Sequence, residues 1–299
     1  MSIITRYPAV PSRLLSIYAA VYDSTDGEPR DQLEAFSTPA SLATRGASEE
    51  EEAGSSLFIS ALQEALRLRL VEEVEGRIRI ASRPLEGRSR KRIGAEDAFK
   101  RAVTTTLFNP TLAQETEHAA FMLATSWLLR KSPLRPLSFS EAPQETLRED
   151  LGDHRDRTEL TNLARYQNFL YWARYLGFAS FVGFESERRI IPDPTQAIQA
   201  ALPEIFSTQQ AFDIEPFLGA LNQILPVFEG GTAWLEVEAM KPIPSDDDDT
   251  LSIATSLALR RLADRNLIKL ESVADARGRI LQFGMETERV TRIRRADIQ

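Results

Sequence analysis

Two histidines are the residues of this sequence best suited to acid–base or metal chemistry, because cysteine is absent. His118 lies in ETEHAAFML, where Glu115 precedes it by three residues and is placed to share its helix face. A zinc site needs three or four ligands at characteristic spacings, and His118 and His154 form neither an HExxH nor an HxH pattern. The sequence therefore predicts no metal site and no catalytic histidine, and it favours a polar position on a helix surface for His118.

Two further segments contain residue types that bind ions. Asp246–Asp249 offers oxygen ligands for a hard cation, but the Gly and Glu positions of an EF-hand loop are missing, which favours a solvated loop that caps the next helix. Gly230 and Gly231 would let the backbone approach a phosphate, yet no Lys accompanies them, which favours a turn between helices. Motifs of nucleotide hydrolysis, dinucleotide binding, serine hydrolysis and kinases are absent. We therefore expect a protein without catalytic residues and without a cofactor.

Length and charge restrict the class of protein. The 299 residues, 42% of them hydrophobic, suffice for two or three modest cores. The net charge of −8 argues against indiscriminate coating of nucleic acid, but residues 260–295 form a basic pole with ten Lys/Arg and five Asp/Glu. Glu49–Glu52, in contrast, is predicted to be an acidic solvated loop. The longest apolar stretch, residues 119–129, is too short to cross a bilayer, so we expect no membrane association and a cytoplasmic location.

One order of elements recurs three times: a helix, a strand, a turn and a returning strand. The helices are predicted over residues 55–70, 159–178 and 251–267. The ribbons are predicted over residues 71–81, 179–192 and 268–283, with RILQF (279–283) returning beside IKLES (268–272). A helix that leads into a two-stranded ribbon cannot bury its apolar face alone, so each copy needs the helices before it. Those helices are predicted at 13–22, 31–36, 95–108, 112–129, 214–225 and 232–240.

The repeat indicates a mainly α fold with small β-hairpins, an α+β class. Residues 83–94 are predicted to link the first and middle copies, and the proline-bearing segment and helix around 191–206 to bridge the middle and last. The expected domains are residues 1–94, 95–205 and 206–299. A long proline-containing insertion, residues 132–156, makes the middle domain the least regular.

The stretch ALRRLADRNLIKLESVADARGRILQF resembles the recognition helix, wing strands and wing of winged helix-turn-helix proteins. The resemblance extends well to the first copy, less well to the middle one, and implies two or three tandem winged-helix modules. In that superfamily the third helix enters the major groove of DNA and the wing touches its backbone. It therefore implies DNA contacts in the last module, through an exposed helix face, the wing and a basic extension. These residues are Ser252, Thr255, Ser256, Arg260, Arg277, Arg279, Arg289, Arg292, Arg294 and Arg295.

The first and middle copies are poorer candidates for DNA contact. The third helix of the first copy offers Ser60, Gln63, Glu64 and Arg67. The acidic residues before it would repel phosphates. The basic residues beyond its wing could contact the DNA backbone, but a solvated basic linker is the favoured interpretation. These residues are Arg88, Arg90, Lys91 and Arg92. In the middle helix, an aromatic core is favoured over base stacking for Tyr166, Phe169, Tyr171, Trp172 and Tyr175.

The middle stretch YWARYLGFASFVGFESERRIIPDPTQAI, set between two winged-helix patterns, resembles DpdG-like accessory proteins of bacterial DNA-modification and phage-defence islands. That resemblance implies a role beside modification or restriction enzymes, with no catalytic residues to carry over. The two resemblances favour a non-catalytic DNA-binding or DNA-facing accessory subunit, with double-stranded DNA and other protein subunits as partners. A protein–protein adaptor without DNA contact and a transcriptional regulator are the alternatives.

Overall fold

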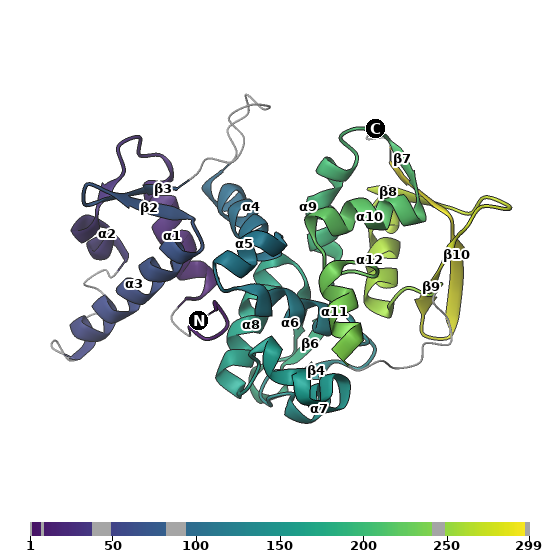
Figure 1. The fold of residues 1–299 in the computed structure, drawn as a ribbon, viewed down its shortest axis with the longest axis horizontal. Coiled ribbons are helices and arrows are strands. Elements are labelled where there is room, and N and C mark those ends of the chain that lie inside the picture. The colour runs from purple at the N-terminus through teal and green to yellow at the C-terminus, as the bar shows by residue number, and fades with distance from the viewer. Residues whose placement is uncertain (1, 7–8, 38–48, 82–93, 241–248, 297–299) are drawn as a thin grey trace. The chain divides into compact units, whose positions relative to one another are not determined.

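The computed structural model describes residues 2–6, 9–37, 49–81, 94–240 and 249–296. The chain divides into two compact units, residues 1–118 and 119–299 (Figure 1). Helices dominate both units and are accompanied by small antiparallel sheets, which confirms the expected α+β class. The finer division into domains 1–94, 95–205 and 206–299 stays a prediction.

The first unit is built around helix α1. Its helices are α1 (Pro11–Tyr22), α2 (Arg30–Ser37), α3 (Glu49–Arg67), α4 (Ala95–Phe108) and α5 (Pro110–Glu115). Its strands are β1 (Glu28–Pro29), β2 (Val71–Val74) and β3 (Arg77–Ile80). Helix α1 contacts α3, α4 and β3, because its apolar residues recur at helical spacing and all face inward. The buried residues of that face are Leu14, Ile17, Tyr18 and Val21.

The ribbon of the first unit matches its prediction. Glu75 and Gly76 connect β2 to β3 and both have a positive φ, of 53° and 74°. Two such residues make a tight turn whose twist suits antiparallel strands. The expected loop at Glu49–Glu52 is wrong, because the backbone is already helical from Glu49 onward.

The second unit begins with the elements of the middle copy. Its helices are α6 (Ala119–Leu129), α7 (Gln144–Leu151), the 3-10 helix η2 (Gly152–Thr158), α8 (Leu163–Leu176), the 3-10 turn η3 (Glu185–Glu187) and α9 (Thr195–Ile205). Its strands are β4 (Leu137–Ser138), β5 (Ala179–Val182) and β6 (Arg189–Pro192). The predicted insertion thus contributes β4 and α7, and the predicted bridging helix is α9.

The last copy completes the second unit. Its helices are α10 (Ile214–Ile224), α11 (Thr232–Met240) and α12 (Ile253–Asp264). Its strands are β7 (Ala211–Asp213), β8 (Ile268–Glu271), β9 (Arg279–Phe283), β10 (Glu286–Val290) and β11 (Arg292–Arg295). Helix α12 packs against α9, β8 and β9, and α11 packs against α6, so the two copies share one unit.

Three of the sheets in the described chain have the same strand order. They are β1-β3-β2, β4-β6-β5 and β7-β11-β8. In each, the short strand that comes first in the chain pairs with the last strand, which therefore lies in the centre. The sequence predicted the first two ribbons, β2–β3 and β5–β6, but not β1, β4 and β7, because two or three residues are too few to show an alternating pattern.

Two predicted elements are corrected. Residues 112–129 are not one helix, because Glu117 has a positive φ of 61° and separates α5 from α6. RILQF does not return beside IKLES, since β9 pairs with β10 and β8 pairs with β11. In chain order, the hairpin β9–β10 thus lies between β8 and β11, the two longer strands of the third sheet. Among the described residues, no helix combines the length and apolar character needed to cross a membrane.

Candidate nucleic-acid interface

The first turn of α12 carries the predicted groove-reading residues. Ser252 is the N-cap, and its Oγ accepts a hydrogen bond from Thr255 N at 3.2 Å. The carboxylate of Glu229 accepts two more, from Ser252 N at 2.7 Å and from Thr255 Oγ1 at 3.0 Å. A carboxylate is favourable here because the free N–H groups and the helix dipole make a helix N-terminus positive. Glu229 therefore occupies the position that a phosphate would otherwise favour.

The polar face of α12 is covered by the hairpin β9–β10. A backbone N–H of β9 donates to Ser256 Oγ at 3.0 Å, and both Thr255 and Ser256 are fully buried. Arg260 pairs with Glu288 of β10, and its guanidinium lies 5.2 Å from the ring centre of Phe283. The expected exposed face is therefore wrong for Thr255 and Ser256. Both are buried because β9 pairs with β10 rather than with β8, and the resulting hairpin covers this face of the helix.

Four of the seven arginines predicted to contact DNA in the last module are in ion pairs. The pairs are Arg260–Glu288, Arg279–Glu215, Arg292–Asp213 and Arg294–Glu271. Burial acts to lower the pKa of Arg279, but the hydrogen bond and charge of Glu215 outweigh it and raise that pKa above its ordinary value. Arg277 is exposed between β8 and β9, and among the described residues no carboxylate pairs with it. Arg88, Arg90, Lys91 and Arg92 lie outside the described residues.

The aromatic residues of α8 form a core, as the sequence favoured. Tyr166, Phe169 and Trp172 are fully buried, and burial raises the pKa of the Tyr166 hydroxyl. Tyr171 differs, because 39% of it is exposed. Tyr171 lies on the side of α8 that is next to the β5–β6 ribbon, where its ring neighbours that of Phe181.

On this side of α8 and on the neighbouring strands, aromatic side chains lie next to arginine side chains. The ring centres of Phe139, Tyr171 and Phe181 lie 5.4–6.3 Å apart. The guanidinium of Arg174 lies over Phe181 and that of Arg188 over Phe139, each at 5.0 Å. In the part of the chain that the structure describes, no carboxylate pairs with either arginine. Their charges are therefore available to a ligand.

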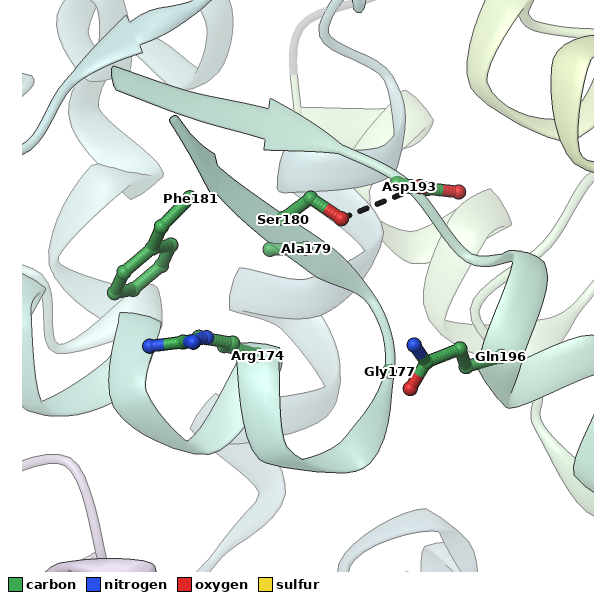
Figure 2. A pocket seen from close by; sticks show the side chains of 7 residues that line it. All are labelled: Arg174, Gly177, Ala179, Ser180, Phe181, Asp193 and Gln196. Carbon is green, nitrogen blue, oxygen red and sulfur yellow. Dashed lines mark hydrogen bonds between the residues drawn. The ribbon is translucent and has the colours of Figure 1, made fainter. Parts of the chain in front are cut away.

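A pocket of about 380 Å³ opens where α8 ends, β5 begins and α9 begins (Figure 2). Its lining residues are Arg174, Gly177, Ala179, Ser180, Phe181, Asp193 and Gln196. Gly177 ends α8 with a φ of 87°, and a Cβ there would lie 2.7 Å from Gln196 Cβ and 2.9 Å from Ala197 N. Glycine is therefore what lets the two helices approach closely enough to form this wall.

Asp193 holds one side of the pocket in place. Its Oδ1 accepts hydrogen bonds from the backbone N–H and the hydroxyl of Thr195, and its Oδ2 accepts one from Ser180 Oγ at 3.3 Å (Figure 2). Arg261 Nη1 lies 2.8 Å from the same Oδ2. These contacts use the acceptor capacity of the carboxylate and balance its charge. Arg174 is then the cation of the pocket without a counter-charge among the residues that line it.

A second feature that the sequence did not reveal is a buried carboxylate with two partners in the first unit. Glu64 and His118 are both fully buried, and His118 Nε2 is hydrogen-bonded to Glu64 Oε1 at 2.7 Å. Arg6 Nε lies 3.2 Å from Glu64 Oε2. The expected surface position of His118 is wrong, because α5 ends before Glu117 and the chain no longer follows a helix there. Within the described residues, no three His, Cys, Asp or Glu side chains are grouped as a metal site would require.

Comparison with known proteins places the chain. The DpdG-like family matches residues 1–276. The chain belongs to the DpdG-like family. This membership indicates involvement in a DNA-modification system. No curated protein and no solved structure shows significant similarity to the chain. The DpdG-like match includes α12 and β8 and ends before β9.

The sequence of this DpdG-like chain did not indicate the pocket. Its polar residues that were not predicted as site residues are Arg174, Ser180, Asp193 and Gln196. The one local signal was Asp193 in the segment IPDPT, because an Asp just before a helix binds the first free N–H groups. Arg174 and Ser180 had no such signal, since their neighbours in the pocket come from another helix.

Proposed function

We propose that this chain is a non-catalytic, DNA-facing accessory subunit of a DNA-modification system, built on winged-helix modules. The observation that carries the proposal is the strand order shared by three sheets, in a member of the DpdG-like family. In the first unit the elements run α1, β1, α2, α3, β2, β3, with the last strand central, which is the order of a winged helix. That scaffold commonly presents a helix and a ribbon to duplex DNA.

The surface proposed to face DNA is that of the ribbons rather than of α12. Glu229 and the β9–β10 hairpin occupy the N-terminus and polar face of α12. Arg189 on β6 and Arg277 before β9 are exposed, and among the described residues neither has a carboxylate partner. An exposed arginine without a carboxylate partner can bind a phosphate by releasing its counter-ions, because it has no ion pair to break.

The test is fluorescence anisotropy with a labelled duplex at low and rising salt. We expect the intact chain to bind with an affinity that falls steeply with salt, since phosphate contacts release counter-ions. The double variant Arg189→Glu/Arg277→Glu should bind about tenfold or more weakly, with a salt slope smaller by about 2. Arg260 and Arg279 are left unchanged, because a carboxylate there would face Glu288 or Glu215.

The matched control is Arg101→Glu, an exposed arginine on α4 with the same change of charge. It should leave the affinity within about twofold of the unchanged chain, as expected for a surface position without contacts. Absence of duplex binding by the unchanged chain at low salt contradicts the DNA-facing proposal. Equal weakening by the control contradicts the assignment of the ribbons.

A protein–protein adaptor is the second candidate, and one observation favours it. Phe184, in the turn between β5 and β6, is 86% exposed and is followed by the exposed Glu185 and Glu187. A large ring in open water is unfavourable unless a partner covers it, and the adjacent carboxylates would repel a DNA backbone. The tip of this ribbon therefore suits a protein partner with a basic rim.

We expect Phe184→Asp to abolish a complex with a partner subunit. Each protein encoded beside this gene would be purified and mixed with the chain, and the mass of the mixture measured by light scattering. Phe36→Asp is the control, because Phe36 is also exposed but belongs to α2 of the first unit. A complex that survives Phe184→Asp, or that both variants abolish equally, counts against this surface.

A further inference from the structure

We infer that the pocket between α8, β5 and α9 binds one nucleotide, with the phosphate at Arg174, the base against the stack of Arg174 on Phe181, and Gln196 at the other end of the pocket as a further hydrogen-bond donor to the nucleotide. The inference rests on the proposed DNA-facing function and names the ligand class of one site. The shared chemistry, a phosphate beside a flat aromatic base, fits both a free nucleotide and a nucleotide of an unpaired strand.

The charge of the pocket favours an anion. Its lining contains one carboxylate, Asp193, which is already neutralised by Arg261 at 2.8 Å. Arg174 is exposed, and no carboxylate of the described chain pairs with it. A guanidinium offers several N–H donors in one plane, which suits a phosphate better than a point charge does.

The uncharged groups of the pocket add donors and a surface for stacking. Gln196 is exposed at the start of α9, and its amide can donate two hydrogen bonds. Figure 2 shows Arg174 and Phe181 at one end of the pocket, Gln196 at the other, and Ser180 hydrogen-bonded to Asp193 along a further side. Bases stack on aromatic rings and on guanidinium planes, whatever their sequence. A phosphate site beside such a stack is characteristic of binding to unpaired nucleotides.

The size and rigidity of the pocket agree with this ligand. Its volume of about 380 Å³ lies in the range of small-molecule sites, roughly 300–1,000 Å³. The walls are held by the contacts of Asp193 with Ser180, Thr195 and Arg261 and by the close approach of α9 to Gly177. A pocket whose walls are already fixed loses little entropy when a ligand binds.

The experiment compares two probes, deoxyadenosine monophosphate by calorimetry and a labelled single-stranded dA oligonucleotide by anisotropy. Gln196→Glu places a charge in the pocket with almost no change of shape. We expect it to weaken binding of at least one probe about tenfold, because the new carboxylate repels an anionic ligand and removes an amide donor. Gln199→Glu is the control, because Gln199 is exposed on the same helix and does not line the pocket.

Arg174→Ala is the second variant, with the exposed Arg135→Ala as its control. Tryptophan fluorescence checks folding, since Trp172 lies on α8 beside the pocket wall. Specific loss with the monophosphate alone identifies a free nucleotide as the ligand, and specific loss with the oligonucleotide identifies an unpaired strand.

Other outcomes overturn the inference and are distinct from failure of the proposed function. If the unchanged chain binds duplex DNA but the pocket variants bind every probe normally, the pocket is no nucleotide site and the DNA-facing function stands. If inorganic phosphate competes as well as the monophosphate, the base takes no part and the inference is wrong. If no DNA binds but the monophosphate binds and is lost with Gln196→Glu, the pocket stands and the DNA-facing function fails.

Discussion

Replacing Glu64 by alanine is expected to destabilise the first unit by about 3–5 kcal/mol, the usual cost of removing one partner of a buried ion pair. The change leaves His118 Nε2 without its acceptor at a fully buried position and removes the carboxylate that lies 3.2 Å from Arg6 Nε. Water cannot replace either contact without opening the core, so the loss is much larger than for an exposed pair. Glu64→Gln should lose less, because an amide oxygen still accepts a hydrogen bond.

Urea unfolding with two probes measures this effect. All three tryptophans, Trp127, Trp172 and Trp234, belong to the second unit, so their fluorescence reports residues 119–299 whereas circular dichroism reports the helices of both units. We expect Glu64→Ala to shift the dichroism transition to lower urea and to move the fluorescence transition less.

The control for this experiment is Gln63→Ala, on the adjacent and exposed position of α3. It loses only an exposed hydrogen bond from Arg6 and should change the free energy of unfolding by about 0.5 kcal/mol or less. A Glu64→Ala variant as stable as this control would show that the buried pair contributes nothing to stability.

Gly177→Ala is expected to destabilise the second unit by about 2–5 kcal/mol. A left-handed conformation costs a residue with a Cβ about 1–2 kcal/mol, and overfilling a packed site adds about 1–3 kcal/mol. Both apply here, because φ is 87° and the new Cβ would lie 2.7 Å from Gln196 Cβ and 2.9 Å from Ala197 N. The start of α9 would have to move away from the end of α8, which also deforms the pocket.

The fluorescence transition is the measurement for Gly177→Ala, since Trp172 lies on the helix that Gly177 ends. Gly219→Ala in α10 is the control, because a Cβ there meets no atom within 4 Å. Alanine should make that helix more stable by about 0.5–1 kcal/mol. A Gly177 variant as stable as the Gly219 variant would contradict the described packing of α8 on α9.

Short-range patterns carried most of what could be predicted about the fold. The β2–β3 hairpin follows from two turn residues between alternating strands, and the end of α8 follows from Gly177. Both depend on neighbours in the chain, as does the apolar stripe of α1. A single sequence contains those signals in full.

Contacts between distant segments explain what could not be predicted. β9 has the composition of a strand that returns to β8, but β8 pairs with the more distant β11 and β9 pairs with β10. Glu64 and His118 are 54 residues apart and each resembles a surface residue in its own segment. The same limit applies to the candidate site, because Arg261 reaches Asp193 from another helix.

The central position of the last strand in each sheet bears on how the chain folds. In the third sheet, Arg292 of β11 bonds to Asp213 of β7 across 79 residues of sequence, and β11 also pairs with β8. Closing so long a loop is entropically costly and slows folding. While only residues up to 290 have left the ribosome, β7 and β8 are present but β11, the strand that pairs with both of them, is not. The last module is therefore the one most exposed to misassembly during synthesis.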